Sequence, residues 1–142
     1  MSWRSALPKS PKNMASAALV DSNVFIALTR RDEDLPRWLG SRFDDIYTCG
    51  MVRLEVLRGI RDPRLRDDMA GFFDVFCHVQ TDNKLWEQAI ELGWELDRRG
   101  RIIPAQDILI AACALREGVP VFTADKHFEN IPGLTVIPFP NP

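Results

Sequence analysis

Four carboxylates interrupt or end apolar runs of the sequence. They are Asp21 in ALVDSN, Glu55 in RLEVL, Asp107 in AQDILI and Asp125 in VFTAD. Carboxylates are rarely left in apolar segments unless something compensates their charge. If the fold gathers the four, a hard divalent cation, which prefers oxygen ligands, would relieve both their mutual repulsion and their loss of hydration. The pattern therefore predicts a Mg²⁺ or Mn²⁺ site.

Each of these carboxylates also has a purely structural interpretation. Asp21 suits the N-cap of a helix, Asp125 suits a turn, and Asp107 suits a first helical turn, where the macrodipole favours negative charge. Glu55 is spaced to pair with Arg58 three residues later. Asp107 is the hardest to explain in this way, because the apolar residues that follow it predict a core-facing helix in which an unpaired carboxylate is costly. The joint pattern favours a shared site.

The elements that must position these residues are short apolar strands separated by helices. The predicted strands are 17–20, 46–49, 119–123 and 134–139. The helical patterns cover 24–28, about 51–60, 63–73, 82–99 and 104–117. Such an alternation is typical of a parallel sheet covered on both faces, in which ligands gather at the carboxyl ends of the strands. Asp21 and Asp125 each follow a predicted strand at that end.

The composition limits the class of protein. The chain has 142 residues, of which 46% are hydrophobic, so one domain with a sizeable core is expected. A formal net charge of −2 gives no overall excess of positive charge for nucleic acid, so any such surface must be local. Only four of the 18 basic residues are lysines, and arginine suits phosphate or a protein partner, although solvated surface charge is the commoner explanation.

The cysteines and the apolar stretches indicate the compartment. Cys49, Cys77 and Cys113 are far apart and lie in or beside apolar segments, which predicts buried thiols in a reducing cytosol. No stretch is long and apolar enough to span a bilayer, so a soluble, cytoplasmic protein is expected. Residues 1–16 lack periodicity and predict a flexible tail ahead of one domain at 17–142, with Met14 as a candidate start of translation.

Four segments in order carry a resemblance to a known family: VDSNV, RLEV, PAQDILIAA and FTADKHF. Over roughly residues 17–140 the chain resembles a PIN domain, and within that family it is most similar to VapC-type toxins of toxin-antitoxin modules. The resemblance implies a three-layer α/β/α fold with a short-stranded, mainly parallel central sheet. It covers the chain after the predicted tail.

The same resemblance implies a metal-dependent endoribonuclease, a hydrolase of RNA phosphodiester bonds that leaves a 5'-phosphate and a 3'-hydroxyl. Asp21, Glu55, Asp107 and Asp125 match the acidic ligands of Mg²⁺ or Mn²⁺ in the family. Asn23 and Thr123 match polar companions of the first and last acid. One or two such ions can lower the pKa of a bound water and offset charge on the leaving oxygen, so no covalent nucleophile is needed.

The implied partners are an RNA substrate, a cognate antitoxin and a second copy of the chain. An acidic pocket that receives RNA needs positive residues at its rim, and the candidates are Arg53, Arg58, Arg98, Arg99, Arg101 and Lys126. An antitoxin could pair with the same arginines or insert an arginine into the pocket, and the sequence leaves both open. Trp86 and Trp94 share one predicted helix with a wide apolar surface, which is the candidate homodimer contact.

Alternative functions fit less well or stay open. A haloacid-dehalogenase-like phosphatase requires a second carboxylate two residues after the first, where this chain has Asn23. A response-regulator receiver requires paired acids after the first strand, but Ser22 follows Asp21. A catalytically silent PIN-like binding module is disfavoured because all four acids are present, whereas an RNA-processing PIN nuclease outside a toxin-antitoxin system stays open.

The two histidines are not predicted to be catalytic. His78 and His127 are distant in sequence and lack a companion at the spacing of a zinc site. His127 is expected to be a packing or hydrogen-bonding residue after the last acid.

Overall fold

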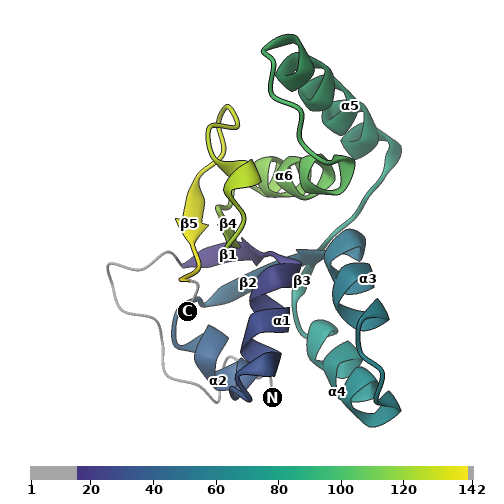
Figure 1. The fold of residues 1–142 in the computed structure, drawn as a ribbon, viewed down its shortest axis with the longest axis vertical. Helices are drawn as coiled ribbons and strands as arrows, with labels where there is room; N and C mark the ends of the chain where they lie inside the picture. Colours follow the sequence, from purple (N-terminus) through teal and green to yellow (C-terminus); the bar gives the residue numbers. More distant parts are fainter. Residues whose placement is uncertain (1–15, 141–142) are drawn as a thin grey trace.

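The computed structural model describes residues 16–140, which form three layers around a five-stranded sheet (Figure 1). The strands are β1 (Ala17–Val20), β2 (Asp45–Cys49), β3 (Cys77–Val79), β4 (Val121–Thr123) and β5 (Val136–Pro138). Their order is β3-β2-β1-β4-β5, and every neighbouring pair is parallel. The predicted α/β/α architecture is confirmed.

Helices cover both faces of this sheet. One face carries α1 (Ser22–Arg30), α2 (Leu35–Gly40), α3 (Gly50–Arg58) and α4 (Pro63–Phe73). The other face carries α6 (Ala105–Glu117), with α5 (Asn83–Arg98) packed on its outer side. A short 3₁₀ helix, η2 (Lys126–Phe128), follows β4.

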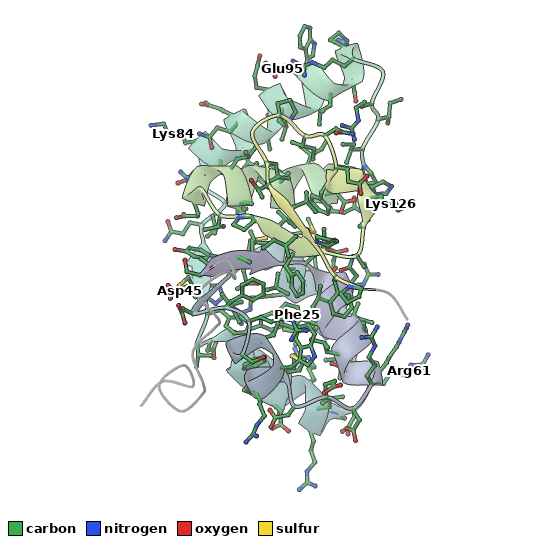
Figure 2. The ribbon with its side chains drawn as sticks, turned by 90° about the vertical axis from the view of Figure 1, so that its left-hand side faces the viewer. Phe25, Asp45, Arg61, Lys84, Glu95 and Lys126 are labelled. Carbon is green, nitrogen blue, oxygen red and sulfur yellow. The ribbon has the colours of Figure 1, made fainter. Side chains whose placement is uncertain are left out.

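Apolar side chains from both layers fill the space against the sheet. Phe25 of α1 is fully buried, and its ring centroid lies 5.0 Å from that of Phe73 of α4; Figure 2 shows Phe25 in the interior. On the opposite face, α6 is buried along the continuous run from Leu109 to Ala114. This run is why the sequence predicts a helix with most of its sides in the core.

Aspartates begin many of the helices. Asp34, Asp62 and Asp82 accept backbone hydrogen bonds from the first turns of α2, α4 and α5, which satisfies donors that the helix itself cannot. Gly118 ends α6 with a φ of 66°, in the left-handed region that favours glycine. These signals explain why the predicted helix ends agree with the observed ones within one to two residues.

Besides the short 3₁₀ helix η2, two elements were not predicted. The edge strand β3 has three residues, and only Val79 among them is buried, so it shows no alternation or length that would mark it. The six-residue helix α2 is also short, although Asp34 before it and Pro36 in its first turn are start signals. The prediction that Cys77 is buried is wrong, because this cysteine lies exposed on β3; Cys49 and Cys113 are buried.

The ends of the chain limit what can be said of the predicted tail. Residues 1–15 and 141–142 lie outside the described residues, so the tail at 1–16 and the candidate start at Met14 stay predictions. Ser16 is described, and its carbonyl oxygen accepts hydrogen bonds from the backbone of Asp44 and Asp45, both at 2.9 Å. Within residues 16–140 no helix is both long and apolar enough to cross a membrane.

Candidate metal centre

The four acids meet at the carboxyl edge of the sheet, where β1 and β4 lie side by side. From β1 the chain runs to β2 and β3 through helices on one face, and then crosses to β4 through α5 and α6 on the other face. β1 and β4 are therefore the point where the direction of winding changes, which is the usual ligand position in open parallel sheets. Asp21 directly follows β1, and Asp125 lies two residues beyond β4.

Asp21 is held by hydrogen bonds to both of its carboxylate oxygens, and it is only 3% exposed. Its Oδ1 accepts the backbone N–H of Ser22 at 2.8 Å, which caps α1. Its Oδ2 accepts the hydroxyl of Thr123 at 2.7 Å and the Nδ2 of Asn23 at 3.3 Å. The carboxylate therefore has a fixed orientation.

Asn23 and Thr123 connect this first acid to the last one. The Nδ2 of Asn23 also donates to Thr123 Oγ1 at 3.2 Å, and its Oδ1 accepts the backbone N–H of Ala124 at 3.2 Å. Thr123 Oγ1 in turn accepts the backbone N–H of Asp125 at 2.9 Å. The side chains of the two predicted supporting residues thus join the carboxyl ends of β1 and β4 and fix the start of the segment that carries Asp125.

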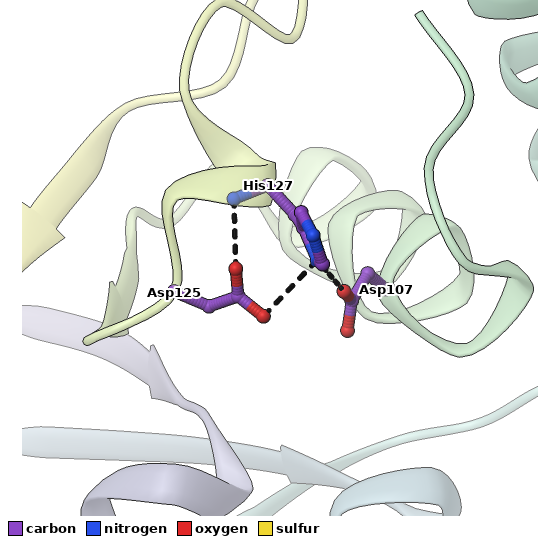
Figure 3. A group of neighbouring side chains, drawn as sticks. All are labelled: Asp107, Asp125 and His127. Atoms are coloured by element: carbon purple, nitrogen blue, oxygen red, sulfur yellow. Dashed lines mark hydrogen bonds and ion pairs between the residues drawn. The ribbon is translucent and has the colours of Figure 1, made fainter.

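Asp107 lies in the first turn of α6 and is buried, as the apolar run after it indicates. Its Oδ2 is 2.8 Å from the Nδ1 of His127 (Figure 3). The same nitrogen lies 3.2 Å from Oδ2 of Asp125, whose Oδ1 accepts the backbone N–H of His127 at 2.8 Å. One ligand atom from each of these three residues lies within 4.8 Å of the other two.

Glu55 completes the group from α3, which packs against α1 and α6. Its Oε1 is buried and has no hydrogen-bond partner among the described residues. Nor does any ion pair in this part of the chain join Glu55 to Arg58, as its structural interpretation would require. A buried carboxylate oxygen without a donor is costly, so this atom is available to accept a cation.

The pKa values show that the acids act on one another. Burial is the main cause that raises the pKa of Asp21, and the charges of Asp107 and Asp125 add to it against the opposing hydrogen bonds. Burial likewise raises the pKa of Glu55, with further contributions from the charges of Asp21 and Asp107, against a hydrogen bond to Ser22 and the charge of Arg58. Burial also raises the pKa of Asp107, although its bond to His127 opposes this. A nearby cation would favour all three ionised forms.

The residues present fit a divalent cation. Four carboxylates supply only oxygen ligands, and one of their oxygens is buried without a partner. Asp21, Glu55, Asp107 and Asp125 could together hold Mg²⁺ or Mn²⁺. Their structural roles are compatible with this, because Asp21 caps α1, Asp125 caps η2 and Asp107 lies in a first turn while their side chains share one site.

His127 is the residue of this site whose position the sequence did not reveal. Its expected role in hydrogen bonding is confirmed, but the bond reaches Asp107, which is 20 residues away in the sequence. Asp107 and Asp125 are the companions that sequence spacing did not show. One sequence feature could have placed His127 beside Asp125. It lies two residues after this aspartate, a spacing at which a capping carboxylate accepts the backbone N–H.

The predicted RNA-binding residues do not form one cluster, although Arg53 and Arg58 together line a pocket on α3. Arg58 lines a pocket of about 330 Å³ together with Glu55, Trp86 and Gln106, so it lies near Glu55. Lys126 is exposed at the start of η2, next to Asp125.

The other four arginines have different surroundings. Arg53 is 3.4 Å from Asp74, and Arg101 donates to the backbone carbonyl of Glu129. Arg98 lies over the ring of Trp94, with 4.8 Å between its Cζ and the ring centroid, and Arg99 caps the end of α5. Their part in RNA binding stays a prediction.

Comparison with known proteins places the chain in a family. Residues 18–134 match the family model of the PIN domain. Ribonuclease VapC1 of Methanocaldococcus jannaschii is 29% identical over 128 residues, which are 88% of each chain. Among solved structures, VapBC2 from Rickettsia felis, bound to a DNA fragment, has a TM-score of 0.73 at 21% identity, covering 87% of this chain and 99% of that chain.

A toxin-antitoxin complex from Klebsiella pneumoniae has a TM-score of 0.69 at 22% identity, covering 86% of this chain and 98% of that chain. These two structural likenesses concern the fold. The match to the family model extends over most of the chain and includes all four acids. The protein therefore belongs to the PIN domain family.

Proposed function

We propose that this protein is a metal-dependent endoribonuclease that hydrolyses RNA phosphodiester bonds and is the toxin of a toxin-antitoxin pair. The observation that carries the proposal is the convergence of four carboxylates at the β1–β4 edge, with an unpartnered buried oxygen on Glu55. A PIN domain relative named a ribonuclease and a structural neighbour solved as a toxin-antitoxin complex support the substrate and the biological role.

The residues of the site have separate tasks in this reaction. Asp21, Glu55, Asp107 and Asp125 would hold Mg²⁺ or Mn²⁺, which supplies activation of water and compensation of charge on the leaving oxygen when bound. Asn23 and Thr123 keep the Asp21 carboxylate and the Asp125 backbone in place through hydrogen bonds of 2.7–3.3 Å. Because these donors are neutral, they orient the acids without removing their negative charge.

RNA would reach the acids along the side formed by α3, α5 and α6. The pocket beside Glu55 is lined by Arg58, which can contact a phosphate, and by Gln106, which can bond a base edge. Lys126 adds a positive charge near Asp125. Replacement of Arg98, Arg99 and Arg101 together by alanine is expected to weaken RNA binding and its salt dependence. An unchanged affinity and an unchanged salt dependence would show that these three arginines do not contact RNA.

The proposed protein partners are a cognate antitoxin and a second copy of the chain. An arginine inserted by the antitoxin would find Glu55 Oε1 free to accept a hydrogen bond, whereas acidic residues of the antitoxin would find exposed arginines such as Arg58.

Free cysteines and an RNA substrate fit a cytoplasmic location.

For the homodimer, the outer face of α5 is the proposed contact. Trp86, Ile90 and Trp94 follow one another at helical spacing and are 46%, 67% and 56% exposed, while the inner face of α5 packs on α6. A twofold axis would place this apolar stripe against itself. Ile90→Lys is expected to convert a dimer to a monomer in sedimentation measurements, and an exposed control, Glu91→Lys, should leave the mass unchanged.

The test of the activity is cleavage of a mixed structured-RNA pool with Mg²⁺, with Mn²⁺ and with a chelator. Asp107→Asn keeps the shape of the side chain but removes its charge, and is expected to lower cleavage by at least about a hundredfold. Asp68→Asn removes the same charge from an exposed position on α4 and serves as the matched control. Metal-dependent cleavage in the wild type and the control, but not in Asp107→Asn, is the expected result.

A different outcome would favour the alternatives. Cleavage that survives the chelator or the Asp107→Asn substitution would reject the carboxylate–metal mechanism. Absence of cleavage by folded, inhibitor-free protein, together with calorimetric metal binding, would favour an RNA-processing nuclease of narrow substrate range. Absence of both would favour a silent binding module.

A further inference from the structure

One ring nitrogen of His127 lies between two of the acids. Nδ1 is 2.8 Å from Oδ2 of Asp107 and 3.2 Å from Oδ2 of Asp125 (Figure 3). The two carboxylates come from different elements, α6 and the segment after β4, so the imidazole is the group through which they meet. A nitrogen in this position is within reach of any cation that both acids bind.

The turn that carries His127 fixes it there. The backbone N–H of His127 donates to Oδ1 of Asp125 at 2.8 Å, which closes η2. The next residue, Phe128, is fully buried and anchors the turn, and η2 packs against α6. The side chain of His127 is half exposed, so the ring contacts both the acids and solvent.

We propose that His127 is a fifth ligand of the metal, bound through Nδ1, and that it makes the site prefer Mn²⁺ over Mg²⁺. The inference rests on the proposed function, because it assumes that the four acids bind a metal. Mg²⁺ takes oxygen ligands and retains water, whereas Mn²⁺ and later transition metals also accept an imidazole nitrogen. A site of four carboxylates alone would have no nitrogen ligand by which to prefer Mn²⁺ over Mg²⁺.

A competing role for the same contact is that of an internal cation. If a protonated His127 occupies the place of the metal, its removal would open the site and raise the affinity for both ions. If His127 only orients Asp107 and Asp125, its removal would lower both affinities to the same extent. A ligand role predicts neither result, because it lowers the affinity for Mn²⁺ selectively.

The chain offers a direct spectroscopic test because it contains only two histidines, His78 and His127. Untagged metal-free protein is loaded with Mn²⁺, and electron spin-echo modulation from ¹⁴N is recorded for the wild type, His127→Ala and His78→Gln. His78 lies on β3 with its Nε2 at 3.1 Å from the carbonyl of Phe73, so it is the matched control. Nitrogen modulation is expected in the wild type and in His78→Gln, and its absence is expected in His127→Ala.

Calorimetric titration of the same proteins with each metal gives the second measurement. His127→Ala is expected to lower the Mn²⁺ affinity about tenfold and to change the Mg²⁺ affinity less than about twofold. Bound Mn²⁺ without nitrogen modulation in the wild type would overturn the inference, as would an equal change of both affinities in either direction. Failure of the wild type to bind either metal would instead overturn the metal dependence of the proposed function.

Discussion

The two halves of the candidate metal centre are held together in different ways. On the β1 side, both oxygens of Asp21 accept hydrogen bonds from neutral donors, including Thr123, and only 3% of the residue is exposed. On the α6 side, Asp107 and Asp125 have no such network between them and meet at the imidazole of His127, which is half exposed.

Because of this difference, the β1 half depends on neutral hydrogen bonds and the α6 half depends on charged groups. Neutral hydrogen bonds orient Asp21 whatever the protonation state of its neighbours, so the β1 half should keep its shape with or without metal. The α6 half depends on the charges of its acids and of His127. The pKa of His127 is raised first of all by its hydrogen bond to Asp107. It should therefore respond more to cations and to pH.

The largest expected effect on stability comes from breaking the neutral network with Thr123→Val. The substitution removes a donor to Asp21 Oδ2 and the acceptor for the backbone N–H of Asp125, at a position that is only 1% exposed. Since buried groups lose their partners, we expect the free energy of unfolding to fall by about 1–3 kcal/mol. Urea denaturation of the metal-free protein measures this.

Thr48→Val provides the control for that experiment. Thr48 is a fully buried threonine of β2 whose hydroxyl has no hydrogen-bond partner in the described structure. Its replacement should leave the free energy of unfolding within about 0.5 kcal/mol of the wild type, or raise it. If the two variants were equally destabilised, the network would not be the source of the stability of the β1 half.

A smaller and opposite effect is expected for Glu55→Gln in metal-free protein. Burial and the charges of Asp21 and Asp107 raise the pKa of Glu55 against a hydrogen bond to Ser22, which the Gln side chain can also make, and its Oε1 has no partner. Removing this charge should raise Tm by about 2–4 °C without metal, and should reduce the gain in Tm that metal gives to the wild type. Thermal unfolding with chelator and with Mn²⁺ measures both shifts.

Glu91→Gln, at an exposed position of α5, is the matched control and should change neither shift. A metal-free Glu55→Gln protein that melts below the wild type would show that Glu55 is stabilised by a partner rather than repelled by its neighbours.

The stability of the metal-free protein should fall gradually as the pH rises. The folded pKa values of Asp21, Glu55, Asp107 and His127 are all raised, so the folded state binds protons more tightly than the unfolded chain. This contribution to stability is complete below the ordinary pKa of each group and is lost as the pH rises through the raised value.

Metal should reverse that loss because it binds the deprotonated carboxylates. The gain in Tm from Mn²⁺ should therefore grow between about pH 5 and pH 8. A gain that stays constant over this range would mean that the acids do not release protons when the metal binds.

The smallest expected effect concerns the rim and compares Arg58→Ala with Arg53→Ala. Arg58 lines the pocket beside Glu55, whereas Arg53 contacts Asp74. In an Asp107→Asn background that prevents cleavage, loss of Arg58 should reduce the slope of RNA affinity against salt concentration by about 1. Arg53→Ala should reduce this slope less than Arg58→Ala does. A larger reduction for Arg53→Ala would place the RNA path on the other side of α3.

Much of the fold could be predicted because its signals are local. Apolar runs that end at Asp21 and near Asp125 mark β1 and β4, and Asp82 and Gly118 mark the start of α5 and the end of α6. These signals depend on a few neighbouring residues, so they survive without knowledge of the fold. The edge strand β3 could not be predicted, because it is defined by pairing with β2 rather than by its own three residues.

The candidate site divides in the same way. The sequence by itself predicted the four acids of the candidate site, since each charge stands against an apolar segment that must be buried. Only the tertiary structure decided that Glu55 keeps an unpartnered oxygen, that Thr123 bonds Asp21 across 102 residues, and that His127 meets Asp107. These relations join β1, β4, α3 and α6, and a hydrogen bond between segments exists only after packing has fixed their distance and direction.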